Sequence, residues 1–329
     1  MIMNTGPLVI RPAFSPTGPG LAPLSALGLP FSVETAAWAV VLLDELHLLI
    51  NTSGQTLHLL ARGPRQIEQL SSLPLVAAGA LACGREILVT GSDPLGQPLV
   101  FGVAGDGKIN WQLALDGPTP VRWPLPACLS QPALVWQVSH GQLEVANCGK
   151  QGLTGSRSFS VGGPPLALAM GQGRIWSAWA SPSGIRVTGI SATHSQEQQL
   201  AHPFANNLAL GTCPSGACLA WTRNGTTFFK RLSLQAESSE APTAMELEGA
   251  SNGVLSLVSG AEPLLWLQNG SSVEDGTRSW VSSFVFPGGE PLQVDGLIHA
   301  VTWWNDTLVL LGSQEVRFLK SSFAGPQNV

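Results

Sequence analysis

The sequence has no tyrosine and few charged residues. Of its 329 residues only 11% are Asp, Glu, Lys or Arg, and Arg outnumbers Lys by twelve to four. With a formal net charge of −5, the chain has no broad basic surface that could neutralise phosphates. We therefore expect no nucleic-acid partner.

Long apolar runs are also missing. The longest, Ala36 to Leu43, is followed directly by Asp44 and Glu45 and falls short of the roughly 18 residues that a membrane span needs. The N-terminus lacks a basic segment followed by a continuous apolar stretch, the pattern of a secretory signal peptide. These absences predict a cytoplasmic protein with no membrane partner.

Cysteine is sparse, and its number is odd. Five cysteines in 329 residues do not indicate a disulfide scaffold. Cys213 and Cys218 flank a short turn, where the two side chains could face each other closely enough for a disulfide. Because a reducing cytoplasm opposes disulfides, we expect both to be buried thiols.

Helical periodicity is absent, and short strand patterns take its place. No segment of ten or more residues repeats its apolar positions with the helical period. Residues 165–206 instead contain four short runs separated by turns rich in Gly, Ser and Pro. These runs are Leu166–Met170, Arg174–Ala180, Ile185–Ile190 and Gln196–Leu200.

Similar segments recur along the whole chain. An apolar second strand followed by a glycine returns at intervals of about 40 to 46 residues, the period of four-stranded propeller blades. Just upstream lie seven short first strands rich in Ala and Gly, which suits strands that converge on one axis. They are expected at Ala37–Leu42, Val76–Ala82, Pro126–Leu129, Leu166–Met170, Leu208–Thr212, Val254–Val258 and Ile298–Trp303.

The seventh repeat is one strand short. The segment Leu8–Ala13 precedes the first repeat and has no sheet of its own, and residues 15–30 are expected to form an extended connector. We therefore predict that Leu8–Ala13 completes the last blade and closes the ring, which removes two open sheet edges. The predicted fold is all-β: one domain over residues 1–329, with seven four-stranded antiparallel blades.

This layout resembles the seven-bladed β-propeller superfamily over nearly the whole chain. The resemblance is to the architecture, since the Gly-His and Trp-Asp signatures of WD40 repeats and the kelch double glycine are missing. The segment Asp275–Trp280 looks slightly like the Asp-box of sialidase-type propellers, but it occurs once. A retaining sialidase needs a tyrosine nucleophile, which this chain lacks.

The resemblance implies that ligands bind where the loops joining fourth to first and second to third strands meet around a central channel. The groups that suit acid–base chemistry are His202, Asp295 and Asp116 in these loops and His299 just inside the next strand. Those that suit ligand contacts are Arg122, Trp123, Glu34, Asn206 and Asn252. The alternative for each is an ordinary turn or capping residue.

Two features of these candidates allow competing interpretations. Arg122 and Trp123 lie in a loop stiffened by four prolines, where they could contact an anion or an aromatic ring, or simply cover the core edge. Trp residues also recur at one repeat position. They could form one sugar-binding pocket per blade, as in lectin propellers, but the Leu and Val before them favour core packing. They are Trp136, Trp179, Trp221 and Trp266.

The motifs of cofactor sites are absent. No histidine pair has metal-binding spacing, and no glycine-rich nucleotide loop precedes a helix. We expect no metal and no cofactor. Two functions stay open: a propeller that binds a protein partner or a small molecule at its loop-rich face, which we favour, and a small-molecule enzyme such as a lyase, cyclase or hydrolase.

Overall fold

The computed structural model of the protein shows only β-strands as regular elements in the residues that it describes, and no helix there could cross a membrane. The described residues are 9–11, 21–33, 35–63, 65–115, 124–139, 141–163, 167–171, 173–191, 194–214, 216–232, 241–245, 253–260, 263–272, 278–287, 289 and 291–321.

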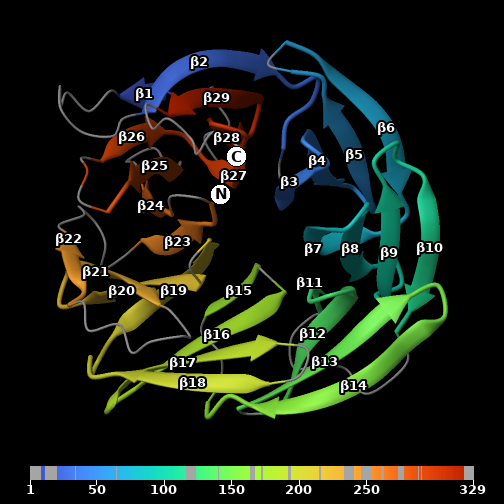
Figure 1. Ribbon diagram of the computed structural model, residues 1–329. Helices are drawn as coiled ribbons and strands as arrows, with labels where there is room; N and C mark the ends of the chain where they lie inside the picture. Colours follow the sequence, from blue (N-terminus) through green and yellow to red (C-terminus); the bar gives the residue numbers. More distant parts are fainter. Residues whose placement is uncertain are drawn as a thin grey trace. The chain divides into compact units, whose positions relative to one another are not determined.

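The chain divides into two compact units, which we call the middle unit (residues 31–164) and the terminal unit (residues 1–30 and 165–329). The middle unit contains three four-stranded antiparallel sheets, each with its strands in sequence order (Figure 1). Their strands are β3 (Ala37–Leu42), β4 (Glu45–Thr52), β5 (Gln55–Ala61) and β6 (Ile67–Leu73); β7 (Val76–Cys83), β8 (Glu86–Ser92), β9 (Pro98–Ala104) and β10 (Ile109–Ala114); and β11 (Leu125–Cys128), β12 (Pro132–Ser139), β13 (Gln142–Gly149) and β14 (Gly152–Ser160).

The terminal unit contains four further antiparallel sheets. Two are built from β15 (Ala167–Gly171), β16 (Arg174–Ser181), β17 (Gly184–Ser191) and β18 (Ser195–Leu200), and from β19 (Asn206–Cys213), β20 (Gly216–Arg223), β21 (Thr226–Leu232) and β22 (Thr243–Met245). The other two contain β23 (Val254–Val258), β24 (Leu264–Ser272), β25 (Arg278–Val285) and β26 (Leu292–Asp295), and β27 (Ile298–Trp304), β28 (Thr307–Gly312) and β29 (Glu315–Ser321). The N-terminal segment adds β1 (Val9–Arg11) and β2 (Leu21–Gly28) to the last two sheets.

The prediction of an all-β chain with seven four-stranded antiparallel blades is confirmed, and β1 adds a fifth strand to the sheet of β23–β26. Each expected first strand is present, and β3 and β23 agree with the prediction at both ends. Within each unit the first strands of successive sheets pack on one another, which explains their small residues. A Cβ added at Gly79 would lie 2.8 Å from Pro126 Cδ, and one at Gly211 would lie 2.9 Å from Leu257 Cβ.

The turn between β20 and β21 shows how local sequence fixes the hairpins. Asn224 and Gly225 have φ values of 51° and 81°, both in the left-handed region. An Asn-Gly pair tolerates this conformation, and the resulting two-residue turn matches the twist of the flanking strands. The register therefore runs without a shift from Ala217 opposite Leu232 to Arg223 opposite Thr226.

The core lies between the faces of successive sheets. In the middle unit, sheets β3–β6 and β7–β10 bury one apolar cluster, and in the terminal unit sheets β15–β18 and β19–β22 bury another. The first includes Val40, Leu49, Ile87, Val89 and Phe101, and the second includes Trp176, Ile185, Leu208, Leu219 and Trp221. Each fully buried large side chain of this kind stabilises the fold by roughly 1.5–3 kcal/mol.

The N-terminal segment completes the last blade, as expected, but with different residues. Strand β2 pairs with β29 from Leu21 opposite Ser321 to Gly28 opposite Glu315, so the segment predicted as a connector is the closing strand (Figure 1). The shorter β1, predicted to close the ring, instead pairs with β26. The proline in β2 concealed it, yet proline is tolerated here because an edge strand needs hydrogen bonds on one side only.

A disulfide that the sequence analysis missed joins two sheets of the middle unit. Cys83 ends β7 and Cys128 ends β11, their Cα atoms lie 5.4 Å apart, and they are separated by 45 residues, which is one repeat. Cysteines at one position of consecutive repeats are thus neighbours in space. The other expectation is confirmed: Cys213 and Cys218 are buried thiols whose Sγ atoms lie 3.4 Å apart. Disulfides persist mainly in oxidising compartments, so this bond gives the predicted cytoplasmic location no support, and the location stays a prediction.

Candidate functional site

The structure places four of the nine predicted site residues. His202, Asn206, Asp295 and His299 all belong to the terminal unit. The other five lie outside the described residues, and they are Glu34, Asp116, Arg122, Trp123 and Asn252.

The aromatic residues that contact His202 lie on the sheet β19–β22. Asp295 and His299 lie on two other sheets of the terminal unit. Asp295 is the last residue of β26, opposite Val281 of β25. His299 lies on β27, and its Nε2 is 3.0 Å from the hydroxyl oxygen of Ser313. The acid–base role that we assigned to them stays a prediction.

His202 lies in the connection from β18 to β19, where its ring covers the edge of an aromatic pair. The ring centre is 4.9 Å from that of Trp221, edge-on, and 5.6 Å from that of Phe228. Trp221 and Phe228 stack on each other at 5.5 Å. The backbone N–H of His202 donates to the carbonyl oxygen of Leu200 at 2.8 Å, which holds the start of the loop.

The surroundings of His202 favour the uncharged ring. Desolvation lowers the pKa of His202, and the positive charges of Arg223 and Lys230 lower it further. The ring is therefore neutral at pH 7. Its Nδ1 and the Nε1 of Trp221 are both buried without a hydrogen-bond partner among the described residues. In this arrangement the imidazole packs against the aromatic pair as an apolar ring would.

A glycine in the neighbouring strand makes room for the start of this loop. Gly184 begins β17 with φ of 144°, and a Cβ at this position would collide with the carbonyl oxygen of Leu200. The chain can therefore leave β18 directly over the turn that precedes β17.

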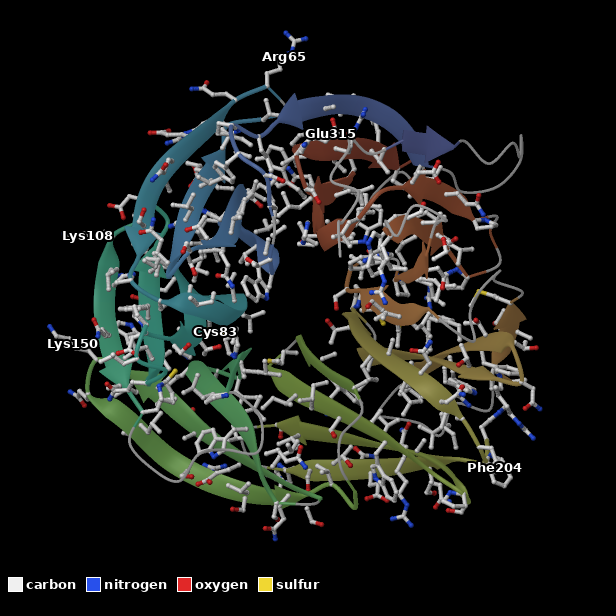
Figure 2. The ribbon with its side chains drawn as sticks, turned by 180° about the vertical axis from the view of Figure 1, so that it is seen from behind. Arg65, Cys83, Lys108, Lys150, Phe204 and Glu315 are labelled. Carbon is white, nitrogen blue, oxygen red and sulfur yellow. A yellow bond between two sulfur atoms is a disulfide. The ribbon has the colours of Figure 1, made fainter. Side chains whose placement is uncertain are left out.

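Phe204 is the most exposed aromatic residue of the described chain. Its side chain is 73% exposed, and its φ of 59° is unusual for a bulky residue. Figure 2 shows the ring beside the yellow strands of the terminal unit, directed away from them. A residue held in this conformation indicates that the surrounding loop, and not its own preference, determines its position.

Two asparagines after Phe204 fix the loop to two sheets. Asn206 Oδ1 accepts a hydrogen bond of 2.5 Å from the hydroxyl of Thr222 on β20. Asn207 Nδ2 donates to the carbonyl oxygen of Gly253 at 2.7 Å, next to β23 of the following sheet. The carboxamide of Asn206 thus has a structural contact, and its predicted role in ligand binding stays a prediction.

These contacts bring together residues from three segments, of which Phe204 and Val254 are exposed and Asn207 and Arg223 are half-buried. Phe204 is two residues before Asn206, Arg223 directly follows Thr222, and Val254, 65% exposed, directly follows Gly253. We call the set Phe204, Asn207, Arg223 and Val254 the Phe204 surface. Sequence reasoning identified the loop but not the exposure of Phe204 or the neighbours that strand register brings to it.

Of the recurring tryptophans in the terminal unit, Trp221 and Trp266 pack in or against the core, as the sequence favoured, and Trp179 is half-buried. Trp221 is fully buried. Trp266 stacks on Phe284 at 6.1 Å, and its Nε1 donates to the hydroxyl of Ser282 at 3.2 Å. Trp179 lies under the guanidinium of Arg186, 5.6 Å from the ring centre. Within the described part of the chain, no three His, Cys, Asp or Glu side chains form a group that could hold a metal ion.

Comparison with known proteins shows the fold alone. No family model matches the chain, and no curated protein matches it. Among solved structures, it is similar to the crystal structure of the RRP9 WD40 repeats, with 12% identity and a TM-score of 0.57, over 95% of this chain and 100% of that one. It is similarly close to the structure of U3-55K, with 12% identity and a TM-score of 0.57, over 91% and 99%. The chain therefore has the fold of a β-propeller.

Proposed function

We propose that this β-propeller is a non-catalytic interaction module that binds a protein partner through the Phe204 surface. The observation that carries the proposal is the exposure of Phe204, a residue that is 73% exposed on a loop fixed at both ends. Large aromatic side chains at protein interfaces contribute much of the binding free energy, because they bury a large apolar area.

The anchoring of the loop supports this function. His202 is held to Leu200 before Phe204, and Asn206 is held to Thr222 after it. Since the loop is already ordered, a partner pays little conformational entropy to dock on it. The fold agrees with this role, because related architectures typically serve as scaffolds for other proteins. A small-molecule ligand, the enzyme alternative and the cytoplasmic location stay predictions.

Comparative affinity capture tests the proposal. Wild-type protein, Phe204→Ala and Leu95→Ala are each immobilised, and the proteins retained from an extract are quantified by mass spectrometry. Leu95 is the matched control, since it is 93% exposed in the β8–β9 turn of the middle unit. We expect at least one protein that wild type and Leu95→Ala retain equally and that Phe204→Ala loses by about tenfold or more. Identical sets for all three proteins would overturn the proposal.

A further inference from the structure

We propose that the segment bound at the Phe204 surface carries a carboxylate beside an apolar side chain: the carboxylate pairs with Arg223, and the apolar side chain packs against Phe204 and Val254. This inference rests on the proposed function and adds the chemistry of the partner. It is carried by the juxtaposition of the Arg223 guanidinium with two exposed apolar side chains, on segments that Asn206 and Asn207 hold to the loop of Phe204.

The apolar half of the surface follows from exposure and connectivity. Phe204 and Val254 are 73% and 65% exposed, and they come from different sheets of the terminal unit. Asn207 joins their segments, because its Nδ2 donates to Gly253 and its Oδ1 accepts from the backbone N–H of Leu255 at 3.4 Å. Both neighbours of Val254 are thus held, so the exposed valine has a fixed position relative to the loop of Phe204.

The charged half of the surface is Arg223, the last residue of β20. Its backbone position is fixed by register, since it pairs with Thr226 across the Asn-Gly turn. The adjacent Thr222 bonds to Asn206, which places Arg223 beside the loop of Phe204. Its charge acts on the ring of His202, where it lowers the pKa. Arg223 makes no ion pair with any described residue, so its guanidinium is available for a carboxylate.

The choice of an acidic partner segment follows from this arrangement. A guanidinium presents paired N–H donors that match the two oxygens of a carboxylate. The neutral ring of His202 adds no competing charge at pH 7. Because the chain carries a net charge of −5, selection of an acidic segment depends on the local cation and not on the overall field. Lys230 adds a second positive charge near His202, but Arg223→Glu changes the charge by two and puts a carboxylate at the point of contact, so it should reverse the preference.

Two fluorescein-labelled peptides serve as probes. In one, Asp and Glu alternate with Leu and Phe; in the other, Lys replaces every acidic residue. Binding is followed by fluorescence anisotropy for wild type, Arg223→Glu, Phe204→Ala and Arg65→Glu. Arg65 is the matched control because it is an exposed arginine of the middle unit (Figure 2), and its substitution changes the net charge equally.

We expect wild type and Arg65→Glu to bind the acidic peptide about tenfold more tightly than the lysine peptide. We expect Arg223→Glu to reverse this order and Phe204→Ala to weaken binding of the acidic peptide about tenfold. Equal binding of the two peptides by wild type, no binding of the acidic peptide at millimolar concentration, or equal effects of Arg65→Glu and Arg223→Glu would each overturn the inference.

The capture experiment separates this inference from the proposed function. If Phe204→Ala loses captured proteins while Arg223→Glu retains them, the surface binds a partner and the acidic chemistry is wrong. If neither variant loses a protein, the proposed function fails together with the inference.

Discussion

Two interfaces between neighbouring sheets, one in each unit, are closed by different chemistry. In the middle unit, hydrogen bonds join the sheets β3–β6 and β7–β10: the Asn51 carboxamide donates to the carbonyl of Ala77 at 2.9 Å and accepts from its N–H at 3.0 Å. In the terminal unit, the aromatic rings of Trp221, Phe228 and His202 close the edge between β15–β18 and β19–β22.

The difference separates a purely structural contact from one that reaches the surface. The Asn51 network is buried, and each of its groups is satisfied within the unit, so it specifies how the two sheets meet. The aromatic edge instead continues through His202 into the exposed Phe204. Substitutions in the first region should therefore cost stability, and those in the second should cost binding.

The largest effect is expected from the disulfide of the middle unit. Reduction of Cys83–Cys128 opens a loop of 45 residues, for which chain entropy predicts a loss of about 4 kcal/mol. Burial raises the pKa of the nearby Cys148 to about 12, so this thiol stays protonated and does not attack the disulfide. The measurement is urea unfolding with and without a thiol-free reductant.

The double substitution of Cys83 and Cys128 to Ser is the control for this measurement. It should unfold at the lower urea concentration in both conditions. If the reductant shifted the double variant as much as wild type, the effect would come from other cysteines.

A smaller loss is expected when the buried network is broken. Asn51→Ala removes three hydrogen bonds, two with Ala77 and one from Thr56, at a cost of about 3 kcal/mol, although the N–H of Ala77 keeps the hydroxyl of Thr56 as an acceptor at 3.0 Å. The matched variant Asn207→Ala in the terminal unit acts on a half-buried group and should cost about 1 kcal/mol. Amide hydrogen exchange of β7 and β23 reports separately how much stability each variant loses. Equal losses for Asn51→Ala and Asn207→Ala would contradict the distinction between the buried network and the region that reaches the surface.

The two buried histidines of the middle unit predict a loss of stability in acid. His47 Nδ1 lies 2.9 Å from His58 Nε2, and burial, followed by the charge of His47, lowers the pKa of His58 to about 4. Well above pH 6.5, His58 is neutral in both the folded and the unfolded chain, so it takes nothing from the free energy of unfolding. As pH falls from 6.5 towards 4, the unfolded chain binds the proton first, so stability decreases, by about 2 kcal/mol at pH 5.

The pH prediction is checked by comparing wild type with His58→Gln between pH 7 and pH 5. The variant cannot take up this proton, so it should lose about 2 kcal/mol less than wild type over the same interval. The charges of Glu45, Arg62 and Asp106 also act on the histidine pair, and all three residues are present in both proteins. Parallel losses would show that His58 is not the group responsible.

The sequence predicts the sheets well because their signals are local. A strand such as Val254–Val258 carries its pattern of apolar residues and turns within a few positions, and the structure has the same bounds. The pairing of the N-terminal segment is not local, so Leu21–Gly28 was mistaken for a connector. The same limit applies to the disulfide, whose cysteines are adjacent only through the packing of two sheets.

For the candidate site, the sequence identified the loop of His202 and Asn206 but not its neighbours. The contact of Asn207 with Gly253 spans 46 residues, and the position of Arg223 follows from strand register. Neither can be read from a local pattern. The exposure of Phe204 is also a property of the folded loop, because an apolar residue after proline is as compatible with a core position.

The smallest effect on stability is expected at Phe204 itself. Phe204→Ala removes an exposed ring, and both residues bear a similar cost for the left-handed backbone, so the free energy of unfolding should change by less than about 0.5 kcal/mol. Phe204→Gly should be slightly more stable, because glycine adopts this conformation without strain. Urea unfolding measures both variants. A loss of about 2 kcal/mol for Phe204→Ala would mean that the ring packs against the rest of the fold. The two units would then differ only in how their sheets pack, and the terminal unit would present no binding surface at Phe204.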